Sequence, residues 1–90
     1  MLKPAPSNRF KRNYMTMKKR GYDMSLIDEV IETLLKEKPL SPEKNDHPLH
    51  GNWIGYRECH VLPNWLLLYK VDGVKLLLNL ERTGTHSDIF

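Results

Sequence analysis

Ninety residues are enough for one domain and too few for two, and 40% apolar with 28% charged residues is typical of a folded globular protein. No apolar run approaches the roughly 20 residues that cross a bilayer, and the single cysteine, Cys59, excludes an internal disulfide and a cysteine-based zinc cage, so we expect a cytoplasmic protein without membrane contact. The net charge of +3 is unevenly distributed, because residues 1–22 carry seven basic and no acidic residues.

The first predicted helix covers residues 8–20 and follows a short N-terminal segment. Pro4 and Pro6 lie in that segment, and because proline cannot donate to a strand ladder, a strand there has to be an edge strand. Ser7 is suited to cap the start of the helix, and Gly21 is suited to end it.

Basic residues cover much of the surface of this helix. Its apolar residues recur at helical spacing and are Phe10, Tyr14 and Met17. The basic residues that close it are Lys18, Lys19 and Arg20. Such a cluster is either a solvated helix face or a surface that meets a polyanion such as RNA.

A second helix is predicted by one apolar stripe at positions i, i+3, i+4, i+7 and i+8. Its members are Ile27, Val30, Ile31, Leu34 and Leu35. Ser25 and Asp28 resemble a capping box at its start, and Pro39 ends it. The short link over residues 21–23 predicts that the two helices form an antiparallel hairpin.

Residues 39–54 have the composition of a loop, and three strands are predicted after them, over residues 56–62, 65–71 and 74–81. Asp72-Gly73 predicts a two-residue turn between the last two strands. That turn pairs the apolar residues that should face the helices, which are Trp65, Leu67, Tyr69, Val71, Val74, Leu76, Leu78 and Leu80.

The turn around Pro63-Asn64 allows two alternatives. A two-residue loop would place Glu58 and His60 on the face packed against the helices. A three-residue loop would place them on the open face, with Cys59 and Val61 inside, and we favour it because it buries apolar groups. The predicted fold is α+β: a helical hairpin packed on one face of a small antiparallel sheet.

Four histidines are the chemically versatile side chains: His47, His50, His60 and His86. No pair has the i, i+4 spacing of helical metal ligands, so the pattern does not indicate a metal or another cofactor. His60 lies near the end of a predicted strand, His47 in the preceding loop and His86 just beyond the last strand. Since strand ends converge with flanking loops, these three histidines can meet at one edge of the sheet.

Two histidines and a cation are what RNA cleavage without a metal requires. One histidine takes the proton of the ribose 2′-OH, another protonates the departing 5′-oxygen, and Arg82 or Arg57 stabilises the charge on the phosphate. Trp65 or Phe90 can stack on an exposed base. The structural alternatives are a core position for Trp65, a salt bridge to a helix acid for Arg57, and a frayed terminus at Phe90.

Several short motifs, in this order, resemble the YafQ branch of the RelE/ParE toxin superfamily. They are Asp46-His-Pro-Leu, Gly51-Asn-Trp, Gly55-Tyr-Arg-Glu-Cys-His-Val, Pro63-Asn-Trp and Arg82-Thr-Gly-Thr-His-Ser-Asp-Ile-Phe. The resemblance spans essentially the whole chain as one toxin domain, residues 1–90, and its C-terminal half carries the specific part.

The resemblance implies a type II toxin with a microbial-ribonuclease-like, RelE-like fold. Such a toxin cuts mRNA in the A site of the 70S ribosome without a metal or cofactor, and leaves a 2′,3′-cyclic phosphate and a 5′-OH. The functional histidines of the family fall on His47, His60 and His86, its C-terminal aromatic on Phe90, and a phosphate contact on Arg82. The implied protein partner is a small cognate antitoxin of the DinJ/RelB-like kind.

One position departs from the family pattern, which commonly has aspartate directly before the tryptophan, where this chain has Asn64. Asparagine keeps an acceptor oxygen but cannot take up a proton at neutral pH. If that residue is the base, the protein is weakened or is only an RNA- or antitoxin-binding domain; if it orients other groups, Asn64 can serve. A ParE-like toxin that poisons gyrase on the same fold is the non-enzymatic alternative.

Overall fold

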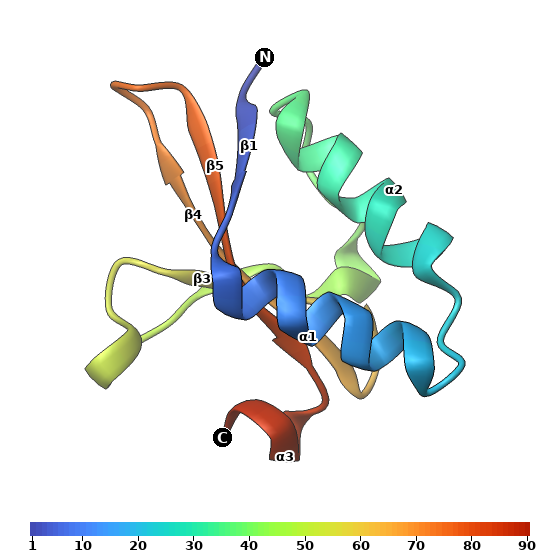
Figure 1. Cartoon of the computed structure of the whole chain (residues 1–90). Coiled ribbons are helices and arrows are strands. Elements are labelled where there is room, and N and C mark those ends of the chain that lie inside the picture. Colours follow the sequence, from blue (N-terminus) through green and yellow to red (C-terminus); the bar gives the residue numbers. More distant parts are fainter.

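The computed structural model describes residues 1–90 as a five-stranded sheet with two long helices against it (Figure 1). The elements, in chain order, are β1 (Lys3–Pro6), α1 (Asn8–Lys19), α2 (Met24–Leu35), β2 (His47–Pro48), β3 (Arg57–Leu62), β4 (Trp65–Asp72), β5 (Leu77–Gly84) and α3 (His86–Ile89). Single 3₁₀ turns, η1 (Pro42–Lys44) and η2 (Gly51–Trp53), interrupt the loop around β2. None of the helices combines the length and the apolar character needed to cross a membrane.

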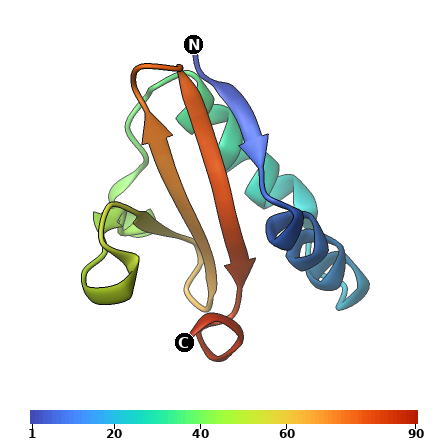
Figure 2. The ribbon, with the colours of Figure 1, turned by 60° about the vertical axis from the view of Figure 1, so that its left-hand side comes forward.

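The strand order is β1-β5-β4-β3-β2, and the predicted α+β fold is confirmed. The sheet is mixed rather than purely antiparallel, because β1 pairs with β5 in parallel while the other neighbours are antiparallel. Figure 2 shows β1 beside β5 at the edge of the sheet, where its two prolines are tolerated.

The first helix begins at the predicted residue, Asn8, and ends at Lys19, one residue before the predicted end. The Ser7 hydroxyl oxygen accepts the N–H of Phe10 at 2.9 Å, and the same hydroxyl donates to the carbonyl of Glu81 in β5 at 3.0 Å. Gly21 follows the helix with φ of +90°, a conformation that favours glycine. The helix is therefore fixed to the sheet at its first residue, and Phe10 and Met17 are buried.

The predicted capping box of the second helix is wrong. Asp23 is the N-cap, since its Oδ1 accepts the N–H of Ser25 at 3.1 Å and the Ser25 hydroxyl at 2.6 Å. Asp28 instead accepts the hydroxyl of Tyr14 at 2.8 Å, which links α2 to α1. Burial, together with this bond, raises the pKa of Tyr14 to about 12.

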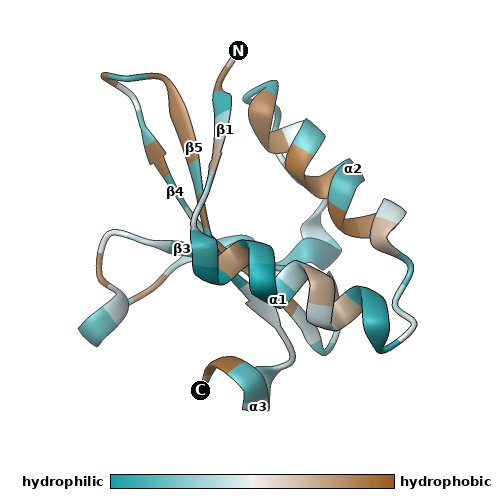
Figure 3. Ribbon diagram, in the orientation of Figure 1, coloured by the Kyte–Doolittle hydropathy of each residue, from teal (hydrophilic) through white to brown (hydrophobic).

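The predicted apolar stripe of α2 is confirmed, with Ile27, Val30 and Leu34 in the core. Figure 3 shows apolar bands along α2 and a more hydrophilic α1. The helix ends before Pro39, because Glu37 adopts φ of +58° and breaks the helical path.

The β4–β5 turn is longer than the predicted two residues. Asp72 pairs with Leu77, so residues 73–76 form the turn and the register moves by four residues. The Asp72 carboxylate accepts the N–H groups of Val74 and Lys75, both at 3.0 Å, and stabilises this wider turn.

For residues 69–72 this shift is even and keeps each residue on its face, and a bulge between Leu68 and Tyr69 takes up one further residue, so most of the predicted apolar row is in the core. The core members are Trp65, Leu67, Tyr69, Leu78 and Leu80. The residues near the tip were predicted wrongly: Val71, Val74 and Leu76 are 44%, 94% and 51% exposed. The wider turn carries them beyond the cover of the helices.

The β3–β4 turn has two residues, Pro63-Asn64, rather than the favoured three. A bulge between His60 and Leu62 shifts the register by one residue, which gives Arg57–His60 the pairing that a three-residue turn would have given. The predicted faces are therefore confirmed: Cys59 and Val61 lie in the core, and Glu58 and His60 lie on the other face.

Candidate active site

Two histidines meet over one buried carboxylate. β2 pairs His47 with Glu58 of β3, and His60 lies two residues further along the same face. The Nε2 atoms of His47 and His60 are 3.7 Å and 3.3 Å from the same oxygen, Oε1 of Glu58. The two rings are 6.4 Å apart, and the Glu58 side chain is only 8% exposed. We call these three residues the histidine cluster.

The other ring nitrogens of the cluster also face acceptors. His47 Nδ1 lies 2.6 Å from the Asn45 carbonyl, and His60 Nδ1 lies 3.2 Å from the Pro63 carbonyl. An imidazolium donates from both nitrogens, whereas a neutral imidazole donates from one. Either ring can therefore take up a proton, because the carboxylate of Glu58 offsets the positive charge of the imidazolium that forms.

Glu58 was not among the functional residues predicted from the sequence. The signal that could have found it is the i, i+2 spacing to His60 on a strand, which places both side chains on one face.

His86 begins α3, directly after β5 and Thr85. Its ring lies against Phe90, with 5.2 Å between centroids, and Phe90 is 56% exposed. Its backbone N–H donates to Oδ1 of Asn64 at 3.3 Å. Asn64 thus contacts the backbone of His86 and not its imidazole.

The three predicted histidines lie in one region of the structure, but they do not all contact the same residue. His47 and His60 share Glu58, whereas the contacts of His86 are with Asn64 and Phe90. The turn at Pro63-Asn64 connects His60 to His86. His60 Nδ1 faces the carbonyl of Pro63, and the backbone N–H of His86 donates to the side chain of Asn64.

The two predicted phosphate-binding arginines lie in different surroundings. Arg82 on β5 pairs in register with Leu68, a neighbour of Glu58 across the sheet. Its Nε donates to Oδ1 of Asn13 in α1 at 3.2 Å, and its Nη2 donates to the Asp88 carbonyl at 3.4 Å. Arg82 is therefore held beside α3.

Arg57 lies on the opposite side of β3 from the histidine cluster, in register with Tyr69 of the core. Its Nε donates to Oδ1 of Asp46 at 3.2 Å, and the Tyr69 hydroxyl donates to the same oxygen at 2.6 Å. The expected phosphate contact of Arg57 is not supported by this position. Its ion pair joins a loop acid and not a helix acid, and it fixes the residue next to His47.

The prediction that Trp65 stacks on a base is wrong, because Trp65 is 0% exposed. Its ring meets the edge of Tyr22 at 5.1 Å, and its indole N–H donates to the Thr83 hydroxyl at 2.9 Å. Thr83 in turn donates to the Leu66 carbonyl at 2.8 Å. Of the two candidate aromatic residues, only Phe90 is accessible.

The three basic residues that close α1 differ in their contacts. Lys18 and Lys19 are exposed. Arg20 instead forms a two-pronged ion pair with Asp88 of α3, at 2.7 and 3.1 Å. No group of three or more histidine, cysteine, aspartate and glutamate side chains has the arrangement of a metal site.

Comparison with known proteins identifies relatives over the full chain. Residues 2–90 match the family model described as a bacterial toxin of type II toxin-antitoxin system, YafQ. The mRNA interferase toxin YafQ of Escherichia coli strain K12 is 39% identical over 85 residues, which are 93% of this chain and 90% of that protein.

Solved structures agree with this match. A chain of the Escherichia coli DinJ–YafQ complex has a TM-score of 0.91 and 36% identity, with 100% of this chain and 99% of that chain covered. A metal-bound toxin from Helicobacter pylori has a TM-score of 0.94 and 38% identity, with 100% of both chains covered. The chain therefore belongs to the YafQ family of toxins from bacterial type II toxin–antitoxin systems.

Proposed function

We propose that this protein is an mRNA endoribonuclease that cuts in the A site of the translating ribosome without a metal. The observation that carries the proposal is the histidine cluster, with a third histidine across the adjoining turn. The Escherichia coli relative bears the name mRNA interferase toxin, which supports the same class of activity. The products are a 2′,3′-cyclic phosphate and a 5′-OH.

The cluster is suited to the role of base. One of its two rings accepts the 2′-OH proton while the 2′-oxygen attacks phosphorus, and the bond from phosphorus to the 5′-oxygen breaks. Glu58, 3.3–3.7 Å from both rings, offsets the positive charge that forms on the ring.

His86 is suited to the role of acid, since its ring is next to Phe90 and no carboxylate is paired with it. Its proton passes to the departing 5′-oxygen. Arg82 stabilises the charge on the phosphate, and Phe90 stacks on a base.

Asn64 fits a role in orientation. Its amide oxygen accepts the N–H of His86 at 3.3 Å, and this contact requires an acceptor oxygen but no titratable group. We therefore propose that the chain is active with asparagine at this position.

Two macromolecular partners follow from the proposal. The first is a cognate antitoxin, because a YafQ relative forms a complex with DinJ. The second is the 70S ribosome with its mRNA, on which the exposed Lys18 and Lys19 contact ribosomal RNA.

The test is cleavage of a defined mRNA on programmed ribosomes, with the 5′ and 3′ ends mapped. His60→Ala and His86→Ala are each expected to slow cleavage by about 10²–10⁴-fold, the usual contribution of acid–base catalysis. His50→Ala is the matched control, because His50 is an exposed histidine before η2, outside the cluster.

Three results would overturn parts of the proposal. Unchanged cleavage by both variants refutes the histidine mechanism. Loss of cleavage in a chelator, with recovery on adding a divalent metal, refutes metal independence. Growth arrest with a DNA-damage response and intact mRNA favours a gyrase poison instead.

A further inference from the structure

The C-terminal helix α3 carries His86 and Phe90 but is too short to hold its own position. It has four residues, and isolated helices shorter than about 12–15 residues are marginal in water. Its orientation therefore depends on contacts with the rest of the protein.

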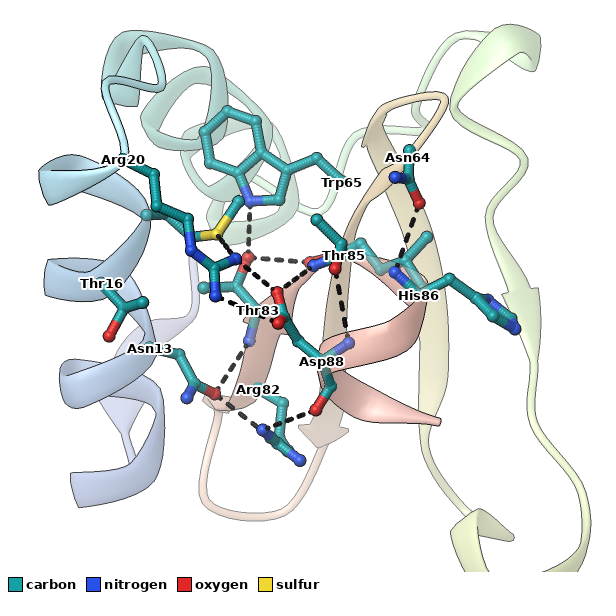
Figure 4. A network of polar contacts seen from close by, with 12 residues as sticks. Asn13, Thr16, Arg20, Asn64, Trp65, Arg82, Thr83, Thr85, His86 and Asp88 are labelled. Atoms are coloured by element: carbon teal, nitrogen blue, oxygen red, sulfur yellow. Dashed lines mark hydrogen bonds and ion pairs between the residues drawn. The ribbon is translucent and has the colours of Figure 1, made fainter.

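Most of these contacts converge on Asp88 (Figure 4). Its Oδ2 is 2.7 Å from Nη1 of Arg20, and its Oδ1 is 3.1 Å from Nη2 of the same side chain. Oδ2 also accepts the N–H of Thr85 at 2.8 Å, while the Thr85 hydroxyl accepts the N–H of Asp88 at 3.3 Å. The Asp88 carbonyl accepts from Arg82.

The end of β5 is shaped for this contact. A Cβ atom at Gly84 would lie 3.0 Å from both Cβ and Oδ2 of Asp88, tighter than nine in ten contacts of real Cβ atoms. Glycine at this position thus lets Asp88 pack directly against the strand.

We propose that the Arg20–Asp88 ion pair is a latch that fixes α3 against α1 and so positions His86 and Phe90 for RNA. Asp88 is a positioning residue, and Arg20 serves the latch and not the RNA. The pair joins residues 68 apart in the sequence, and two-pronged arginine–carboxylate pairs fix orientation as well as distance. The effect on catalysis rests on the proposed ribonuclease function; the effect on α3 does not.

The test compares Arg20→Gln, Asp88→Asn and the double variant with Arg12→Gln. Arg12 is an exposed arginine of the same helix with no side-chain bond, so its variant removes the same charge without touching the latch. Backbone heteronuclear NOE values for residues 85–90 report the order of α3. The indole N–H signal of buried Trp65 reports the integrity of the fold.

If the latch exists, both single variants lose order in residues 85–90 and show about tenfold lower kcat with little change in KM. The double variant is no worse than either single variant, because each one alone opens the latch. Arg20→Lys keeps the positive charge but cannot form the two-pronged contact of a guanidinium, so it recovers part of the order in residues 85–90 and part of kcat. Arg12→Gln leaves the NOE values and kcat unchanged.

Opposite effects of the two single variants, with weaker activity for Arg20→Gln and stronger activity for Asp88→Asn, would show that Arg20 meets RNA and would overturn the latch. Unchanged order of residues 85–90 in both variants would overturn it as well. If wild-type protein cuts no mRNA while the variants still lose order in α3, the latch stands and the ribonuclease proposal fails.

Discussion

Glu58 offers the most direct test of the histidine cluster, through the substitution Glu58→Gln. The change keeps the size of the side chain and removes the charge 3.3 Å and 3.7 Å from the two Nε2 atoms. The Glu58 side chain is 8% exposed, so solvent does little to replace the lost charge.

The magnitude follows from the number and kind of contacts. A hydrogen bond to a charged group contributes about 1.5–3 kcal/mol, and each 1.4 kcal/mol is tenfold in rate. Neither contact has the geometry of a hydrogen bond, so both are ion-pair contacts, and the two histidines are 38% and 24% exposed; we therefore take the lower half of this range. We expect kcat to fall by about 10–50-fold.

The assay is multiple-turnover cleavage over a series of concentrations of programmed ribosomes, with kcat and KM determined separately. Glu81→Gln is the control, since Glu81 is a partly exposed carboxylate on β5, separated from β3 by β4, with no side-chain bond. Glu58→Asp, which keeps the charge on a shorter side chain, should recover part of the rate. If Glu58→Gln cleaves like wild type, or changes KM alone, Glu58 does not serve the proton transfer.

Three further predictions concern other parts of the structure. Asn64→Asp should strengthen the bond to the His86 N–H and raise cleavage no more than about thirtyfold, because a hydrogen bond to a charged group gains only about 1–2 kcal/mol over a neutral one. A thousandfold rise in the ribosome assay would show that this position supplies a base. Burial raises the pKa of the Cys59 thiol to about 12, so a thiol reagent at pH 8 should modify the native protein no faster than it unfolds, and faster labelling would contradict the buried position. The Arg20 guanidinium, with the Thr85 N–H, holds the pKa of Asp88 far below its usual range. The stability that this carboxylate contributes is therefore complete above about pH 4 and is lost as the pH falls further. The difference in Tm between wild type and Asp88→Asn should shrink below about pH 4, and a constant difference would argue against the ion pair.

Much of the fold could be predicted, because the assignment of residues to the buried or the exposed face of the sheet stayed correct even where the length of a turn was wrong. Asp72-Gly73 is a strong two-residue turn signal, yet the Asp72 side chain stabilises a turn over residues 73–76. The resulting shift is four residues next to the turn, which is even, and the bulge between Leu68 and Tyr69 takes up one further residue, so the core residues of β4 and β5 were still assigned to the correct face. The bulge after His60 compensated for the wrong loop length in the same way.

The site was predicted less completely because its contacts link distant parts of the chain. His47 was expected in a loop that could approach His60, but neither its pairing with β3 nor the shared carboxylate of Glu58 was predicted. The ion pair that engages Arg20 is with a residue 68 positions away, and no local pattern indicates it. Trp65 was ambiguous for another reason, since an aromatic residue on a strand suits a core and a stacking surface equally well.

The anchoring of Asp46 links assembly of the core to assembly of the site. Asp46 is bonded to Tyr69 and Arg57 on the helix-packed side of the sheet, while the next residue, His47, approaches Glu58 on the other side. The loop at Asp46 and His47 is therefore held by contacts on both faces of the sheet. These contacts involve residues of β3 and β4, so they require that these two strands have paired. A chain in which β3 and β4 have not paired therefore has no assembled histidine cluster, so the geometry of the site depends on the folding of the core.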